Sequence, residues 1–316
     1  MKKYYTALSL LTLILVSSCV SSKSIYYGKI IEKKYKVGNF NTVNFSGPAE
    51  LIITQGKTTS LVVKAYSKFQ EYVKVNEKGR KLNISFDKNL TDYETLSLNP
   101  VQYILTVDKL ECLKLSGNAK AEIRDLKQYE IRFIQEDHSS INLYNLNVEN
   151  LMLMNDGIHN ITGSNIIIDT LDLSVLSKGS IGLNSIKGNF VNAVINSSGD
   201  ISLGGRVDLV DILSMKKGEF MAENLIADKV NILIKNTGNA YVNAKLNIKA
   251  KITGDGNLYY TGSPKAIIYE GNYNKVIEII NKVPVSSIKE KMIRKNSEVK
   301  NVANKALVRT VIVENT

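Results

Sequence analysis

The chain has 316 residues and 44% hydrophobic residues, enough apolar material to fold as one large domain or two ordinary ones and too much for a disordered chain. Two cysteines exclude a disulfide framework, and two histidines exclude a histidine-rich metal cluster. The net charge of +11 raises the question of a polyanionic partner, but no basic and aromatic motif of the nucleic-acid-binding type is present.

The first eighteen residues have the layout of a secretory signal peptide. Two lysines precede an apolar run from Ala7 to Val16, which is shorter than the ~20 residues that a membrane-spanning helix needs. The run ends in Val-Ser-Ser-Cys, which resembles the lipobox of bacterial lipoproteins. This resemblance implies cleavage after Ser18 and acylation of Cys19, with residues 19–36 as a tether. The alternative is an ordinary signal peptide with a cysteine there by chance.

A lipid anchor at Cys19 predicts attachment to a membrane, and a bacterial outer membrane is the expected one. No acidic run follows Cys19, which favours the periplasmic side of that membrane over the cell surface. Cys112 then has no partner for a disulfide. Because it stands between apolar residues, we expect it to be a small core residue.

Small turn residues recur about every twenty positions through the middle of the chain. They are Gly117, Asp137, Gly157, Gly179, Gly199, Gly218, Gly238 and Gly256, at intervals of 20, 20, 22, 20, 19, 20 and 18. Such self-similarity is typical of repeat architectures.

Aligning the segments on these turns gives apolar columns. Four residues before the turn stand Leu113, Phe133, Leu153, Val175, Ile195, Ser214, Ile234 and Ile252. Two residues after it stand Ala119, Ser139, His159, Ile181, Ile201, Phe220, Ala240 and Leu258. Four residues after it stand Ala121, Ile141, Ile161, Leu183, Leu203, Ala222, Val242 and Tyr260. Alternating apolar and polar positions predict strands with one side inside.

These columns predict an all-β fold, a β-solenoid with coils of about 20 residues. Twenty residues at ~3.3 Å give a perimeter of roughly 66 Å, and eight coils spaced ~4.8 Å apart rise roughly 38 Å. A β-sandwich with evenly spaced strands is the alternative. Residues 37–110 are less regular, with strands expected around Val43 to Ile53, at 61–63, 73–75, 82–86 and 103–107, and turns at 56–59 and 77–80.

Residues 265–316 form a basic tail, with eight basic and three acidic residues from Lys282 onward. Ser287 to Glu290 fits a capping box, and apolar residues from Ile288 to Ala306 predict a modest amphipathic helix. The residues from Thr310 to Val313 predict a final strand.

Four segments resemble the family described as "putative autotransporter adhesin, head-GIN domain". They are Phe40–Gly47, Leu115–Ala119, Asn196–Ile201 and Ile252–Pro264. The resemblance covers roughly residues 37–264 and implies a right-handed parallel β-helix in an exported, often lipid-anchored envelope protein. It implies no catalytic residues and no cofactor. Asp137 stands where the family usually has a turn glycine.

Few residues predict chemistry. His138 falls in an outward column and His159 in an inward one, so we expect their side chains to point apart and not to bind a metal ion together. His159 is then a core imidazole with one hydrogen-bond partner. Asp200 and Glu219 share an outward column one coil apart, which is a weak acidic spot and not a convincing glycosidase site.

Met221, Tyr241 and Tyr259 predict an apolar ladder three residues after the turn. Exposed, such a ladder would bind sugar rings or a partner protein; the alternative is that it lies under the tail. The leading interpretation is a non-catalytic, lipid-anchored adhesion or binding protein. The alternatives are a polysaccharide-processing β-helix enzyme and a purely structural envelope component.

Overall fold

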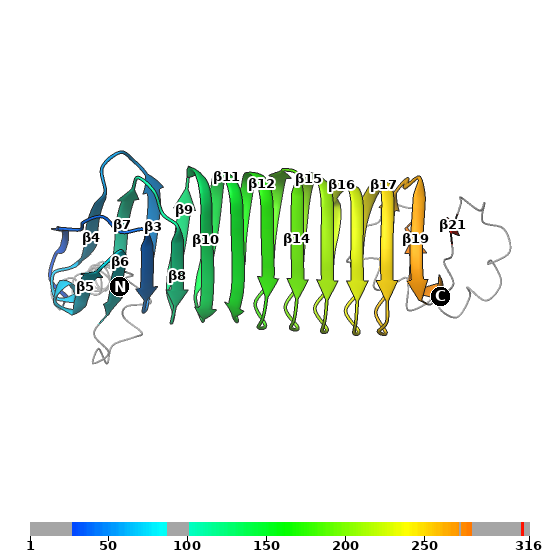
Figure 1. Cartoon of the computed structure of the whole chain (residues 1–316). Coiled ribbons are helices and arrows are strands. Elements are labelled where there is room, and N and C mark those ends of the chain that lie inside the picture. The colour runs from blue at the N-terminus through cyan, green and yellow to red at the C-terminus, as the bar shows by residue number, and fades with distance from the viewer. Residues whose placement is uncertain (1–26, 87–100, 272, 280–310, 313–316) are drawn as a thin grey trace, which may run out of the picture. The chain divides into compact units, whose positions relative to one another are not determined.

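The computed structural model describes residues 27–86, 101–271, 273–279 and 311–312. The chain divides into two compact units, residues 1–123 and 124–316, here called unit 1 and unit 2. Nearly every element in both units is a β-strand, as predicted (Figure 1). The predicted signal peptide, the predicted acylation site at Cys19 and the predicted amphipathic helix of the tail lie outside the described residues.

Unit 1 is built from strands that pair in both directions. These are β1 (Ile30–Tyr35), β2 (Thr42–Ser46), β3 (Ala49–Gln55), β4 (Ser60–Tyr66), β5 (Val73–Lys78), β6 (Lys81–Phe86), β7 (Val101–Val107), β8 (Cys112–Ser116) and β9 (Lys120–Arg124), with a 3-10 helix at Phe69–Tyr72. β1–β4, β4–β7 and β5–β6 are antiparallel, whereas β3–β7, β2–β6 and β2–β8 are parallel. The strands and turns expected here are therefore present, but the pairing mixes two directions.

The strand that begins at Cys112 corrects one prediction. Leu113 and Leu115 are fully buried, and alternation places Cys112 on the opposite side of β8, where it is half-buried. Cys112 forms no disulfide within the described part of the chain, and it is partly exposed and not a core residue.

Unit 2 is a stack of parallel strands. They are β10 (Lys127–Asp137), β11 (Ser140–Gly157), β12 (Ile161–Val175), β13 (Ile181–Lys187), β14 (Phe190–Ile195), β15 (Ile201–Ser214), β16 (Phe220–Ile234), β17 (Ala240–Ile252), β18 (Leu258–Gly262), β19 (Ala266–Gly271), β20 (Val276–Glu278) and β21 (Val311–Ile312), with a 3-10 helix at Tyr273–Lys275. Each residue pairs with the one about 20 positions later, for example Leu151 with Leu171. The β-solenoid prediction is confirmed (Figure 1).

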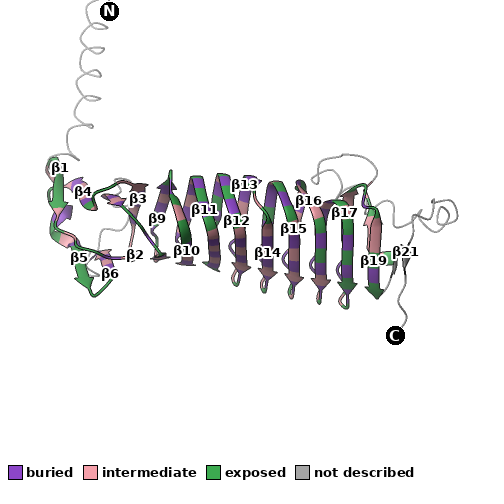
Figure 2. Ribbon diagram, turned by 45° about the horizontal axis from the view of Figure 1, so that its top comes forward, coloured by how far each residue is buried: buried purple, intermediate pink, exposed green. Residues whose placement is uncertain are grey.

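The interior of unit 2 is a set of aliphatic columns that continue from coil to coil. Figure 2 shows the resulting alternation of buried and exposed bands along each strand. One column runs through Ile141, Ile161, Ile181, Ile201, Phe220, Ala240 and Leu258, all essentially inaccessible to solvent. A single coil has no partner for its inward side chains, so burial requires the neighbouring coils.

The columns differ from the expected ones by two positions in the early coils. Leu153 pairs with Leu173 and not with Val175, and Ile161 pairs with Ile181 and not with Leu183. The repeat between these coils is therefore 20 residues, and the interval of 22 arose because Gly157 is not the equivalent of Gly179. A shift of two keeps every inward residue inward, so the alternation pattern could not reveal the error.

The glycine at the turn is required by the close approach of successive coils. A Cβ atom on Gly179 would lie 2.0 Å from the carbonyl oxygen of His159, and one on Gly199 would lie 2.1 Å from that of Gly179. Gly218, Gly238 and Gly256 repeat this contact with the preceding glycine at 2.0 to 2.2 Å. No side chain fits there, which explains why glycine recurs at this position in every coil from Gly179 to Gly256.

A second recurring corner uses left-handed residues instead of close contacts. Asp125, Asn145, Asn165 and Ser185 have positive φ values of 54° to 56°, a conformation that aspartate and asparagine tolerate better than most residues. The Asn145 amide donates to Asp125 at 2.9 Å, and the Asn165 amide donates to Asn145 at 3.1 Å. These side chains tie one coil to the next along this corner.

The stack continues beyond residue 264, where the tail was expected to begin. β19 pairs parallel with β17, and β20 pairs parallel with β18. Val311 and Ile312 form β21, as the sequence predicted for the last strand, and pair with Ile267 and Ile268 of β19.

Candidate functional site

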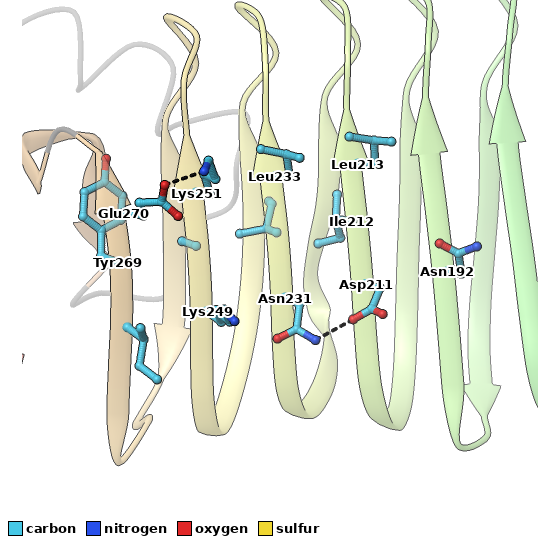
Figure 3. A pocket seen from close by; sticks show the side chains of 13 residues that line it. Asn192, Asp211, Ile212, Leu213, Asn231, Leu233, Lys249, Lys251, Tyr269 and Glu270 are labelled. Carbon is cyan, nitrogen blue, oxygen red and sulfur yellow. Dashed lines mark hydrogen bonds and ion pairs between the residues drawn. The ribbon is translucent and has the colours of Figure 1, made fainter. Parts of the chain in front are cut away.

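An open groove lies on the outer face of unit 2, across strands β14, β15, β16, β17 and β19. It encloses about 550 Å³. Parallel register places equivalent outward residues of successive coils in rows that run across the strands. Two such rows border the groove, and they differ in character (Figure 3).

The first row carries hydrogen-bonding groups. It contains Asn192, Asp211, Asn231 and Lys249, and it ends at the exposed Ile268. The Asn231 amide donates to the Asp211 carboxylate at 2.7 Å. Lys249 is exposed and lines the groove, so its ammonium group can reach a ligand.

The second row is apolar over two coils and charged over the next two. Leu213 pairs with Leu233, which pairs with Lys251, and Lys251 pairs with Glu270. Lys251 and Glu270 form an ion pair in which both side chains keep about half of their surface in solvent, 48% and 62%. The two exposed charges are therefore only weakly held together.

Inward residues complete the lining between the two rows. Ile212, Ile232, Ala250 and Tyr269 occupy equivalent positions and are all buried. Burial raises the pKa of the Tyr269 hydroxyl, so it remains protonated at neutral pH. Two lysines and two carboxylates line the groove, which therefore carries no net charge.

The predicted ladder of Met221, Tyr241 and Tyr259 is present on β16, β17 and β18, outside the lining of the groove. The three residues are in register, and the two tyrosine rings are stacked with centroids 4.9 Å apart. Both tyrosines are buried, with exposed fractions of 4% and 9%. Desolvation and the nearby Glu219 carboxylate raise the pKa of Tyr241 and of Tyr259. The rings do not offer an open platform, and their role in binding stays a prediction.

The acidic pair expected one coil apart holds the turns together. The Asp200 carboxylate accepts a hydrogen bond from the backbone N–H of Glu219 at 2.8 Å. The Glu219 carboxylate accepts one from the Asn239 amide at 3.3 Å. Both carboxylates are therefore engaged with the neighbouring coil.

The two histidines lie differently from the prediction. Both His138 and His159 are exposed, and their ring centroids are 6.1 Å apart. The placement of His159 in an inward column was wrong because of the same two-residue error. His159 occupies the turn position that Gly179 occupies one coil later. The inward residue of its coil, equivalent to Ile181, is Ile161.

The sequence contains a signal for the groove, and it lies outside the columns next to the glycine turns. Along β15, β16 and β17, outward positions alternate with inward ones. The outward positions of β15 and β16 include Leu213 and Leu233. An outward leucine repeated on consecutive coils is the feature that would have located this surface.

Within the described ranges no cluster of three or more potential metal-ligating histidine, cysteine or acidic side chains occurs. The same ranges contain no helix of the length and hydropathy that crossing a bilayer would require.

Fold and groove together define a β-solenoid protein with an open groove on one outer face. The family model described as "putative auto-transporter adhesin, head GIN domain" matches residues 39–165 and again residues 152–264. The chain belongs to this family. The two overlapping matches cover most of the region in which the repeat was recognised. The family is adhesin-like, which is consistent with a bacterial surface or envelope protein that binds and does not catalyse.

Solved structures with the same fold come from two Parabacteroides species. A "putative adhesin" from Parabacteroides distasonis is 21% identical, with a TM-score of 0.56, over 80% of this chain and 98% of that one. A "putative lipid binding protein" from the same species is 19% identical, with a TM-score of 0.55, over 80% and 97%. A "putative adhesin" from Parabacteroides merdae is 22% identical, with a TM-score of 0.50, over 79% and 94%. At these identities the likeness concerns the fold. None of the curated proteins compared with the chain matches it.

Proposed function

We propose that this protein is a lipid-anchored component of the bacterial cell envelope that binds an extended, uncharged glycan along the groove of unit 2 without cleaving it. The observation that carries the proposal is the pairing of a hydrogen-bonding row with an apolar row on one outer face. Sugars present hydroxyl groups at their edges and C–H groups on their faces, so a surface of this composition complements them.

The repeat of the groove suits a linear ligand. Equivalent residues recur with each strand, at a spacing of ~4.8 Å, which is about the advance of one sugar unit in an extended glycan. Asp211, Asn231 and Lys249 would contact successive units, while Leu213 and Leu233 pack against their apolar faces. The balanced charges of the groove favour an uncharged ligand over a polyanion.

Substitution of the apolar row tests the binding proposal. Leu233→Asp is expected to lower the affinity for a linear neutral oligosaccharide at least about tenfold, because the charge removes the apolar contact and must be desolvated on binding. Ile167→Asp is the matched control, since Ile167 is outward and 50% exposed on β12 outside the groove. Calorimetric titration of a panel of neutral and charged oligosaccharides measures both, and equal affinities for the two variants would contradict the proposal.

The same panel distinguishes binding from hydrolysis. Chromatography of the oligosaccharides after prolonged incubation should show no shorter products. Fragments released by the wild type and not by an Asp211→Asn variant would favour the polysaccharide-processing alternative. Failure of all oligosaccharides to bind, together with capture of an extended peptide in the groove, would favour a protein ligand.

Detergent partitioning tests the anchor independently. The full-length protein is expected to enter the detergent phase, and Cys19→Ala is expected to return it to the aqueous phase because the acyl chains are lost. Cys112→Ala is the control, because this cysteine lies on strand β8 in the folded part of the chain. Unchanged partitioning of the Cys19 variant would count against the lipid anchor.

A further inference from the structure

The two histidines of the chain meet on the outside of unit 2, at the turn edge of the early coils. His138 lies in the turn between β10 and β11, and His159 lies in the turn between β11 and β12. They are 21 positions apart in the sequence, and the stacking of the coils brings their rings to a centroid distance of 6.1 Å. The planes of the two rings are nearly perpendicular, at 89°.

Among the residues that the structure describes, no group other than the second histidine contacts either imidazole ring. Both residues are exposed, and no hydrogen bond or ion pair to either ring is found among the residues that the structure describes. The nitrogen atoms of both rings are therefore available to an external ligand. Buried or hydrogen-bonded histidines, by contrast, would have to give up a partner first.

The backbone beneath this pair is fixed. The Gln135 amide donates to the backbone carbonyl of His159 at 2.9 Å, and the Asn155 amide donates to the same carbonyl at 2.9 Å. Gln135 and Asn155 are completely buried, so two interior side chains anchor the turn that carries His159. Gln135 also donates to the carbonyl of Ser139, next to His138, at 2.6 Å. One buried amide thus holds both turns in place.

The spacing of the rings fits joint coordination of one ion. A histidine nitrogen binds a metal such as zinc at ~2.0–2.1 Å, which puts the ring centroid about 3.2 Å from the ion and two such centroids about 5–6 Å apart. The observed 6.1 Å is within reach of this range by a small rotation of exposed side chains. Backbones held by buried amides, together with exposed imidazoles, meet the geometric requirement for a two-histidine site.

We infer that His138 and His159 together bind one divalent transition-metal ion on the surface of unit 2. Imidazole ligands select Zn²⁺, Cu²⁺ or Ni²⁺ over Mg²⁺ and Ca²⁺, which prefer oxygen. Two protein ligands leave the remaining coordination positions to water or to a donor from another molecule, so the ion is exchangeable.

Nuclear magnetic resonance of the intact protein tests the site directly, because the chain has only two histidines. Addition of one equivalent of Zn²⁺ is expected to shift the imidazole signals of both histidines together, while Mg²⁺ shifts neither. Calorimetry should give one Zn²⁺ per chain for this site. His138→Asn and His159→Asn should each weaken binding at least tenfold, since either change removes one of the two ligands.

Two controls separate this site from other ligands. Cys112→Ala removes a thiol that could bind Zn²⁺ elsewhere on the protein, and it should leave the Zn²⁺ affinity of the histidine pair unchanged. Circular dichroism should show that the two histidine variants remain folded, because both side chains are exposed. The inference is overturned if only one imidazole signal responds, or if either folded histidine variant binds Zn²⁺ as tightly as the wild type.

Discussion

Units 1 and 2 bury similar aliphatic side chains by different strand pairings. In unit 2 nearly every residue pairs with its equivalent one coil later, so one position repeats the same environment many times. In unit 1 the antiparallel pairs β1–β4, β4–β7 and β5–β6 give each position an environment of its own. Where the environment of a position repeats, every coil needs the same kind of residue there, and the sequence shows a column of similar residues. Where the environment does not repeat, the sequence shows no such column.

The largest effect is expected from truncation of a large side chain in a column of unit 2. Phe220→Ala should lower the free energy of unfolding by about 3–5 kcal/mol, because Phe220 is fully buried between Ile201 and Ala240. Urea unfolding measures the loss, and hydrogen exchange should show it spreading to the adjacent strands β15 and β17.

The counterpart in unit 1 is Phe45→Ala. Phe45 is buried and meets Tyr103 edge to face with centroids 5.0 Å apart. A loss of similar size is expected, but the increased exchange should stay within unit 1. Exchange that rises equally in both units after either substitution would show that the division into two units has no energetic meaning.

A smaller loss of stability is expected from substitution of the turn glycines. The physical cause of this loss differs between the two units. Gly218→Ala should cost about 1–3 kcal/mol, because its Cβ would lie 2.0 Å from the backbone oxygen of Gly199. Gly182→Ala is the control in the same unit, since nothing lies within 4 Å of a Cβ there, and its effect should stay within about 0.5 kcal/mol.

In unit 1 the corresponding substitution is Gly79→Ala. Gly79 has a φ of +61° with nothing near its Cβ, so the expected cost of about 1 kcal/mol comes from backbone strain alone. Asparagine tolerates this conformation, so Gly79→Asn should recover part of the loss, whereas Gly218→Asn should not. Thermal melts of the four variants and Gly182→Ala check this ranking; recovery at Gly218 would contradict the close-contact explanation.

The smallest effect is expected at Tyr103 in unit 1. Its hydroxyl group is buried and has no hydrogen-bond partner among the described residues, and burial raises its pKa. Tyr103→Phe removes an unsatisfied polar group at almost constant volume, so stability should be unchanged or rise by up to about 1 kcal/mol. A clear loss of stability in urea unfolding would indicate a partner for this hydroxyl group, for example a buried water molecule.

Residues of the turns show where sequence reasoning was reliable and where it failed. Gly199, Gly218, Gly238 and Gly256 marked true equivalents, because one steric contact selects glycine at all of them. Gly157 is not equivalent to these glycines. It pairs with Asp137, whereas the residue equivalent to Gly179 in the preceding coil is His159. A two-residue shift preserves the alternation of side chains, so both alignments satisfied the same pattern.

By itself, the amino-acid sequence determined that unit 2 is a stack of about twenty-residue coils with aliphatic inner columns, because hydrophobic alternation and steric contact at the turns are local constraints that recur. Only the tertiary structure decided which residues become neighbours across coils. The fold places the His138 ring close to the His159 ring, and it places Leu213 and Leu233 in the same groove as Asp211 and Asn231. Outward positions carry no burial constraint, so their partners follow from the register of the backbone and cannot be read from their own residue types.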